Sequence, residues 1–473
     1  MDSVVRGVGA DYDDAARARP NNYERLSQRH PRVQMSSLAQ RVGRNPLPAG
    51  TLAVGAGLVL AGVAQYGFLA VSARALGSAH YAPLATFWAL LFVCGPGFFL
   101  PLEQEVGRAL SARRALGQGG RPLVIRAAVA GGGLAIVLIL ATALASGPID
   151  TRLFNGDAVM LWAFIAGLVA YCIEHLARGT LAGNGRFRPY GLLIGSEGVL
   201  RVVLCTLLAV AGAKIAGLFG FSLVIASYAA VAIALAGRRG LLRAGPPASW
   251  RELSRALGFL LVSSVLTQFL LSIGTVAVQL LAPASQQAAA GRFLTSRILA
   301  YIPIFLLQAV QAPLLPKLSA LAASGNHREF RRVLIELLLF VSVLGGLATV
   351  GFAAFGPLAS SLLFGGGFEL GHLDYALLAA SCAAFMVAQV LNQAIVSLSG
   401  YPRATAGWVT GATAFVVVTL LGSQLFLRVE LGLLVGSVAT VAVMSVLLVP
   451  LLRSHVRAVE ANELFAAAPP AEV

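Results

Sequence analysis

Two apolar segments of the sequence carry polar side chains at helical spacing. In residues 257–281 the polar positions recur every three or four residues, within an arc of about 80° on one helix face. They are Ser264, Gln268, Ser272, Thr275 and Gln279. In residues 293–315 a similar arc holds Arg297, Tyr301, Gln308 and Gln311. Unpaired polar groups are costly in hydrocarbon, so the two faces predict a substrate cavity or, alternatively, hydrogen bonds between helices.

A third candidate is an acid–base pair in residues 190–212. Glu197 and Arg201 are four positions apart and share a helix face with Tyr190. Arg201 comes eleven residues after Tyr190, which is a depth of about 16 Å along a helix. A buried pair of this kind can hold helices together. Alternatively, Arg201 binds an anion, while Glu197 tunes it or holds a coupling ion or proton.

Other ionisable residues lie near the ends of apolar segments. Arg74 and Arg292 flank two of them, where an arginine either attracts an anion or anchors the chain at the membrane interface. Glu103 and Glu105 lie close enough to a segment end to be hydrated. The six histidines, including His175, lie in loops, tails or at segment ends, so we expect no deep histidine proton relay. The cysteines lack the spacing of disulfides or a metal site, and we expect no cofactor.

The composition places these candidates in a membrane protein. Hydrophobic residues make up 58% of the chain and charged residues 12%, with a mean hydropathy of +0.80, whereas soluble domains carry roughly 25% charged residues. A helix that crosses a bilayer needs roughly 20 apolar residues. Twelve such spans are predicted. They cover about 51–72, 82–103, 123–146, 158–177, 190–212 and 215–236, then 257–281, 293–315, 333–355, 375–399, 405–426 and 431–452.

The distribution of basic residues predicts the orientation. With a cytoplasmic N-terminus, the inward segments hold 28 Lys and Arg and the outward loops hold five, so both termini are expected in the cytoplasm. The net charge of +15 then reflects topology and anionic lipids, and no nucleic-acid partner is expected. No loop exceeds about 20 residues, too few for a folded catalytic domain, which argues against an enzyme.

The predicted fold is an all-α integral membrane protein with about twelve transmembrane helices in two six-helix lobes. A basic, disordered cytoplasmic tail covers residues 1–50, the first lobe 51–237, a cytoplasmic linker 238–256, the second lobe 257–453 and a cytoplasmic tail 454–473. Each half begins and ends on the same side, which suits a parallel repeat about the membrane normal.

Two stretches resemble a known family: ARALGSAHYAPLATF, residues 73–87, and RGTLAGNGRFRPYGLLIGSEGVLRVVL, residues 178–204. They resemble bacterial Wzx-type polysaccharide flippases of the multidrug/oligosaccharidyl-lipid/polysaccharide (MOP) exporter superfamily. The resemblance implies a V-shaped, MATE-like transporter whose central cavity is lined by spans one, two, seven and eight. It implies that a polyprenyl-pyrophosphate-linked glycan is moved to the outer leaflet of the bacterial inner membrane by alternating access, for cell-surface polysaccharide synthesis.

That cargo fits the candidate residues. Arg201, Arg292 or Arg297 would bind the pyrophosphate, and the Gln, Ser and Tyr side chains would bond the sugars. Membrane lipids and cytoplasmic glycosyltransferases are the expected partners. Related peptidoglycan-precursor flippases carry several basic residues in their first two helices, whereas the first span here has only Gln65 and Tyr66 at mid-membrane, which argues against that precursor.

Three other functions stay open. A drug or cation antiporter of the same superfamily would prefer acidic cavity residues, whereas two of the three deep charges here are positive. An integral-membrane glycosyltransferase or polymerase typically has acidic residues in an early outer loop, and residues 73–81 contain none. A scaffold that recruits polysaccharide enzymes without transport would tolerate the loss of Arg201 and Arg297.

Overall fold

A computed structural model describes residues 51–250, 257–286, 288–304, 307, 318, 321–322 and 326–467. Within these ranges the chain forms helices, turns and loops and no strand. The helical bundle lies within one compact unit, Leu52–Val473. The predicted tail at 1–50 lies outside the described residues, as do Gln308 and Gln311.

The first half of the chain forms one group of helices. They are α3 (Thr51–Ala115), α4 (Arg121–Leu144), α5 (Ser146–Pro148), η1 (Ile149–Leu153), α6 (Ala158–Gly183), α7 (Phe187–Val210) and α8 (Ala216–Leu235). α3 contains the first two predicted spans, which meet at Gly77, where φ is 73°. Glycine adopts this left-handed conformation at little cost, so the chain can turn there before the second span starts at His80. α6 packs against α4, α7 and α8.

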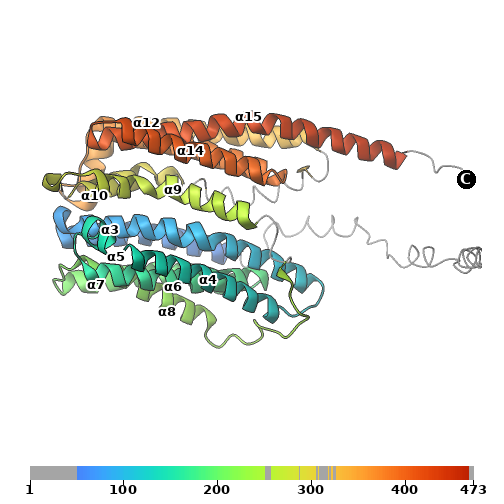
Figure 1. The fold of residues 1–473 in the computed structure, drawn as a ribbon, viewed down its shortest axis with the longest axis horizontal. Coiled ribbons are helices and arrows are strands. Elements are labelled where there is room, and N and C mark those ends of the chain that lie inside the picture. Colours follow the sequence, from blue (N-terminus) through green and yellow to red (C-terminus); the bar gives the residue numbers. More distant parts are fainter. Residues whose placement is uncertain are drawn as a thin grey trace, which may run out of the picture. The chain divides into compact units, whose positions relative to one another are not determined.

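The second half has its own group of helices. They are α9 (Leu257–Leu281), η3 (Ala284–Gln286), α10 (Ala289–Ala300), α12 (His327–Phe364), α13 (His372–Ser397), α14 (Tyr401–Leu421) and α15 (Leu425–Ala467). α13 packs against α12 and α15, and α14 packs against α15 and α9. Figure 1 shows α3 to α8 gathered on one side of the bundle and α9 to α15 on the other.

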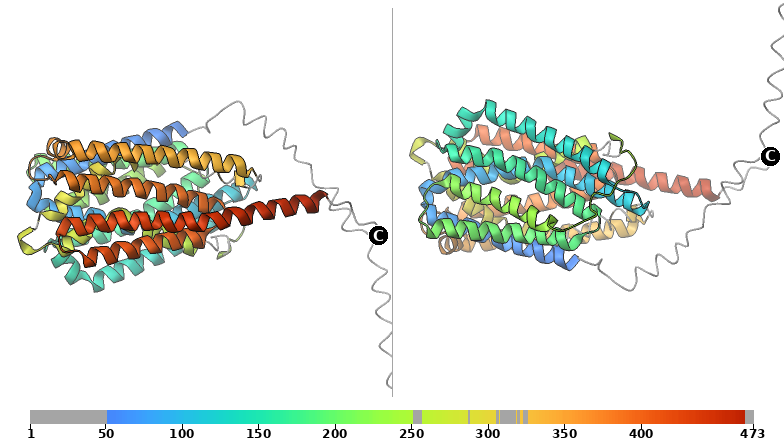
Figure 2. Two further views of the ribbon diagram at one scale, coloured as in Figure 1. Left: turned by 90° about the horizontal axis from the view of Figure 1, so that it is seen from above. Right: turned by 90° about the horizontal axis from the view of Figure 1, so that it is seen from below.

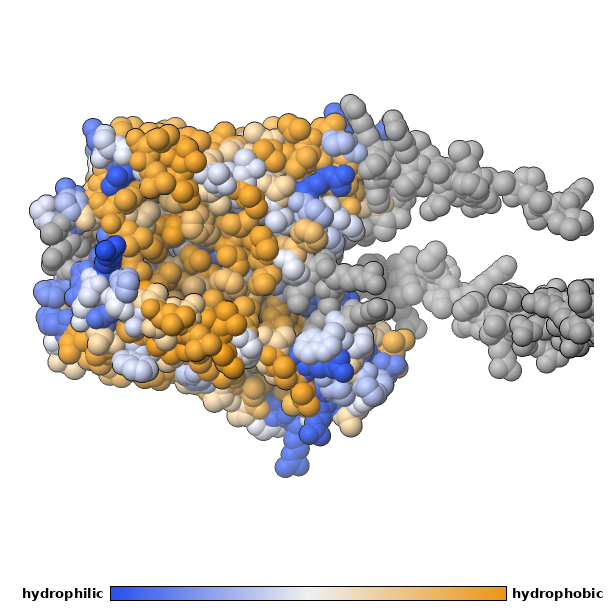
Figure 3. Space-filling model, viewed as in Figure 1, coloured by the Kyte–Doolittle hydropathy of each residue, from blue (hydrophilic) through white to orange (hydrophobic). Residues whose placement is uncertain are grey.

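Eleven of the described helical segments are long and apolar enough to cross a membrane. Many large apolar side chains lie on their outer surfaces, such as Val63, Leu140 and Leu347. Figure 3 shows the resulting broad apolar surface between hydrophilic ends. Only lipid can cover this much exposed apolar surface in a protein of this kind, so the chain is a multi-pass membrane protein. The remaining predicted span, the eighth at 293–315, begins in α10, turns at Tyr301 and continues largely outside the described residues.

Several helices are longer than the predicted spans. The second span continues to Ala115 rather than ending near 103, and α12 covers His327–Phe364 rather than 333–355. α15 begins at Leu425 and runs to Ala467, so Arg428, predicted in an outward loop, lies in a helix. Figure 2 shows α15 extending beyond the other helices. The length of an apolar segment predicts only the part of a helix that lies inside the bilayer. The observed helices are longer because the backbone can stay helical beyond the bilayer, in water.

Close helix packing depends on glycine at the contact between α14 and α15. A Cβ atom at Gly411 would lie 1.9 Å from Oγ1 of Thr440 and 2.7 Å from the Gly436 carbonyl oxygen. Both distances are far below van der Waals contact, so only glycine fits here without movement. Small residues of this kind let membrane helices approach closely when no hydrophobic effect drives them together.

Candidate functional site

A cavity of about 340 Å³ lies between the second span of α3 and the helices α9, α13 and α14. Ile304 and Leu307, which follow α10, close part of it together with Phe385. The polar residues that line it are Gln104, Ser263, Ser264, Thr267, Gln268, Gln389, Asn392, Gln393 and Tyr401. No charged side chain occurs among the lining residues that the structure describes. The cavity is therefore rich in neutral hydrogen-bonding groups inside a membrane protein.

Some of these polar groups have partners and others do not. Asn392 accepts a hydrogen bond through Oδ1 from Nε1 of Trp408 at 3.1 Å. Ser264 donates through Oγ to the Pro96 carbonyl oxygen at 3.3 Å, across the boundary between the two halves. In contrast, Oε1 of Gln268 is buried without a hydrogen-bond partner in the described part of the chain. Unpaired buried polar atoms are uncommon and costly, which marks Gln268 as a position that a ligand can satisfy.

The two halves touch at the end that the sequence predicts to be the outer one. Arg74 donates through Nε to the Leu363 carbonyl oxygen at 3.1 Å and through Nη2 to that of Leu362 at 2.6 Å. Gln279 donates through Nε2 to Oδ1 of Asn155 at 2.9 Å and to the Arg152 carbonyl oxygen at 3.3 Å. The cavity, by contrast, involves residues near the predicted cytoplasmic ends of α9, α13 and α14.

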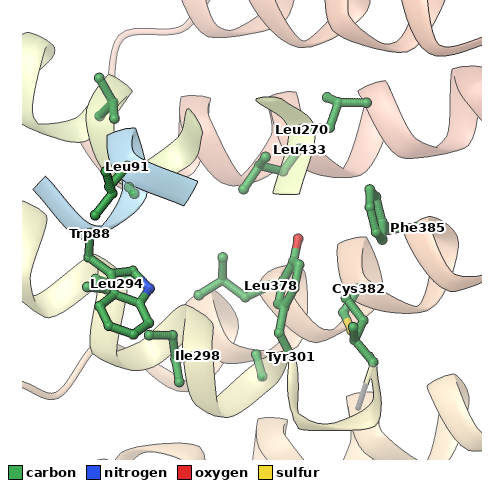
Figure 4. Packing of buried hydrophobic residues seen from close by; sticks show 14 of the residues in the cluster. Trp88, Leu91, Leu270, Leu294, Ile298, Tyr301, Leu378, Cys382, Phe385 and Leu433 are labelled. Carbon is green, nitrogen blue, oxygen red and sulfur yellow. The ribbon is translucent and has the colours of Figure 1, made fainter. Parts of the chain in front are cut away.

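Arg297 in α10 and Tyr301, which directly follows that helix, are not among the described lining residues of the cavity. The guanidinium of Arg297 sits over the Tyr301 ring, 5.1 Å from its centroid, and Nε and Nη1 have no hydrogen-bond partner among the described residues. The Tyr301 hydroxyl is 3.0 Å from Oγ of Ser381. Figure 4 shows Tyr301 between Leu378 and Cys382 of α13. Arg297 is only 6% exposed, so this guanidinium is a buried cation without a described counter-ion.

Four other predicted residues, Ser272, Arg292, Arg74 and Gln279, are not among the described lining residues of the cavity. Ser272 is buried on α9. Arg292 lines a second space of about 380 Å³ at the outer end with Asp374 and Gln424, and its guanidinium lies 5.6 Å from the centroid of the Phe426 ring. On α9 alone, Gln268 lines the cavity, Ser272 is buried beside it along the helix, and Gln279 bonds to the first half, so the residues of one polar face have different neighbours at different depths.

Arg201 and Glu197 form the expected ion pair, and they belong to a larger buried network in the first half. Arg201 also lies over Trp88, 5.3 Å from its ring centroid. Arg178 pairs with Glu174 and lies 3.8 Å from Oε2 of Glu197. Each carboxylate is thus held by a guanidinium, outside the described lining of the cavity.

Two residues of the same network are more deeply buried than the sequence predicts. Glu103 was expected to be hydrated, but it is only 8% exposed and accepts hydrogen bonds from Nδ1 of His175 at 2.6 Å and from the Tyr190 hydroxyl at 3.0 Å. His175 was expected at a segment end and is 2% exposed. Because α6 and α3 continue past the predicted span limits, neighbouring helices cover both side chains.

Sequence reasoning overlooked the contribution of α13 to the cavity. Gln389, Asn392 and Gln393 share one face of this apolar helix, at separations of three and one residues. That pattern is visible in the sequence and is the same kind of signal that identified Gln268. The charged pair Glu174 and Arg178, four residues apart in α6, was an equally visible signal for the buried network.

Proteins of similar sequence align with most of the chain. No known family profile matches it. An uncharacterized protein of Mycobacterium tuberculosis is 27% identical over 427 residues, which cover 87% of this chain and 94% of that one. An uncharacterized protein of Mycobacterium bovis is 23% identical over 433 residues, which cover 87% of this chain and 96% of that one.

Solved structures identify the fold. An inward-facing multidrug resistance MATE family transporter of the MOP superfamily matches with a TM-score of 0.68 at 11% identity, over 84% of this chain and 95% of that chain. A Vibrio cholerae MATE transporter matches with a TM-score of 0.62 at 17% identity, over 89% and 98%. An outward-facing MATE family transporter matches with a TM-score of 0.60 at 12% identity, over 86% and 95%. The chain therefore has the two-lobed fold of MATE transporters.

Proposed function

We propose that this protein is a membrane transporter that moves polyprenyl-pyrophosphate-linked oligosaccharide from the cytoplasmic to the outer leaflet of a bacterial inner membrane. The fold is that of transporters, and both termini are taken to be cytoplasmic from the distribution of basic residues. The transported glycan would serve cell-surface polysaccharide synthesis, with cytoplasmic-side glycosyltransferases as partners that load the carrier lipid.

One observation carries this proposal: the cavity is lined by neutral amides and hydroxyls, without a charged group among its described lining residues. Such groups match the alternating donors and acceptors of sugar hydroxyls. A site for a cationic drug would be expected to offer a carboxylate instead. The carboxylates of Glu174 and Glu197 are not among the described lining residues of the cavity and cannot contact a cationic drug there, which makes a drug antiporter the weaker candidate.

Arg297 is the best candidate to bind the pyrophosphate. Its guanidinium is buried and keeps two nitrogen atoms free of described partners, whereas Arg201 is paired with Glu197. A bare cation near the middle of a membrane is costly, and a phosphate group would supply both charge and acceptors. In this proposal the polyprenyl tail stays between helices while the charged linkage reaches Arg297.

The contacts between the halves fit alternating access. Arg74 and Gln279 join the halves at the predicted outer end. Ser264, by contrast, meets Pro96 beside the cavity, toward the predicted cytoplasmic end. Breaking the outer contacts and closing the halves at the inner end would expose the cavity to the opposite side. Rocking of two lobes around a site near mid-membrane is a general mechanism of transporters with internal repeats.

We also propose that the buried network around Glu197 holds the coupling proton or ion. Three carboxylates, those of Glu103, Glu174 and Glu197, face two guanidiniums and the imidazole of His175. With a neutral His175 the network has a net charge of −1, which is costly in a buried setting. One proton or one monovalent cation restores neutrality, and its release can then be linked to movement of the first half.

Analysis of lipid-linked oligosaccharides in a deletion strain tests the function. We expect the lipid-linked precursor to accumulate on the inner leaflet and the wild-type gene to restore its export. Unchanged precursor lipids would reject flipping and would redirect the search to drug antiport. Restoration by a correctly inserted Arg297→Ala variant that cannot flip lipid in vitro would support a scaffold instead.

A further inference from the structure

Two amide side chains in the cavity offer complementary hydrogen-bonding groups. Asn392 of α13 and Gln268 of α9 both line this space. Because Oδ1 of Asn392 already accepts from Trp408, the amino group of Asn392 remains available to donate. Gln268 contributes the opposite function, since its Oε1 acceptor has no hydrogen-bond partner in the described part of the chain. The same cavity thus contains one oriented donor and one unsatisfied acceptor.

Trp408 fixes the orientation of the donor. Its side chain is fully buried on α14, and its ring lies 5.5 Å from the ring of Phe385, which also lines the cavity. An indole N–H can donate but cannot accept, so it holds the oxygen of the Asn392 amide and directs the nitrogen away. A packed aromatic ring is a rigid support for such a contact.

We propose that Gln268 and Asn392 form a recognition site for a neutral sugar, with Trp408 as the positioning residue that keeps Asn392 in its donating orientation. This inference rests on the proposed function and specifies which part of the cargo the cavity binds. Each sugar hydroxyl both donates and accepts, so hydroxyls of one sugar can satisfy both amides.

The charge of the cavity sets the specificity. A sugar acid would bring a carboxylate into a space whose described lining contains no cation, and an unpaired buried charge is strongly unfavourable. An uncharged sugar meets no such penalty. The site is therefore expected to select neutral sugars over uronic acids, while the charged linkage of the carrier lipid binds elsewhere.

Binding to the full-length protein in lipid nanodiscs tests this site. The probes are hexyl maltoside, a neutral disaccharide on a short alkyl chain, and the matched glucuronide, in which glucuronic acid replaces the terminal glucose of the same disaccharide. Each probe is titrated by calorimetry. We expect the maltoside to bind roughly tenfold more tightly than the glucuronide, because the acidic head group would be unpaired. Equal affinities, or tighter binding of the glucuronide, would overturn the inference.

Variants locate the binding within the cavity. Gln268→Leu and Asn392→Leu should each weaken maltoside binding roughly fivefold, the effect of one lost hydrogen bond. Asn392→Ala removes the same amide without adding a charge or bulk, so it gives the same test if the leucine variant does not fold. Gln118→Leu, which changes an exposed amide outside both cavities, is the matched control. Wild-type affinity in the cavity variants would overturn the proposed site.

A double-variant comparison tests the positioning role. Trp408→Phe should weaken maltoside binding when Asn392 is present and should have no further effect in the Asn392→Leu background. A purely structural contribution of the indole would instead add its own loss in both backgrounds, and that result would reject the positioning role.

These binding measurements do not depend on lipid transport. Normal export of precursor lipids in cells, combined with no preference for the neutral probe, would reject the sugar site alone. A clear preference for the neutral probe, combined with unchanged precursor lipids in the deletion strain, would reject the proposed function alone.

Discussion

Replacing Arg74 with glutamine should weaken the contact that holds the two halves together at the outer end. Arg74 makes two hydrogen bonds to the last carbonyl groups of α12, at 2.6 and 3.1 Å. A hydrogen bond from a charged group contributes about 1.5–3 kcal/mol when it is shielded from water. Arg74 is exposed, and water screens its charge, so we expect its two bonds to contribute about 1 kcal/mol together. The ratio of outward-open to inward-open molecules should then rise about fivefold.

Electron–electron double resonance measures that ratio. Spin labels at Ala211→Cys and Gln424→Cys mark exposed sites near the outer ends of the two halves, after the four native cysteines are replaced. We expect Arg74→Gln to enlarge the population with the longer distance. Lys214→Gln is the matched control, because Lys214 donates to the Ala75 carbonyl oxygen within the first half. Unchanged distances in Arg74→Gln, or an equal change in the control, would refute the reasoning.

Three further substitutions test the buried groups. Arg201→Met leaves its carboxylate partner buried and should lower the stability of the detergent-solubilised protein by about 3–5 kcal/mol; an unchanged unfolding temperature would contradict this. Arg297→Met removes a buried guanidinium without a described partner. The rate of lipid flipping should fall roughly tenfold, while the unfolding temperature should stay the same or rise. A fall in both the flipping rate and the unfolding temperature would indicate a structural role. In Gly411→Ala the added methyl group overlaps Thr440 and should lower the stability of the protein by about 1–3 kcal/mol. Gly351 has open space beside it, so Gly351→Ala should have no such effect. Equal unfolding temperatures for the two variants would contradict this reasoning.

The helices could be predicted because apolar length alone requires them. The limits of the helices could not, because a helix continues into water wherever its residues allow it. The second span shows this at Ala115, where polar and charged residues extend the helix beyond the bilayer. The burial of Glu103 follows from the same extension, since α6 continues alongside it.

The candidate site could be predicted in part. Helical periodicity places Gln268 and Gln279 on one face of α9. It does not predict which helix or loop each side chain contacts along that face. Gln268 lines the cavity, whereas Gln279 reaches Asn155 on the other half. The partners of His175 and Trp408 lie on other helices, at positions that only the tertiary fold brings together.

Reconstitution tests most directly whether the cavity carries a glycan across the bilayer. Purified protein is placed in liposomes that contain a polyprenyl-pyrophosphate-linked oligosaccharide, and a membrane-impermeant glycosidase reports how fast the glycan reaches the other leaflet. We expect transfer that exceeds the protein-free rate and that falls in the Gln268→Leu variant. Equal transfer with and without the protein would contradict the proposed transport.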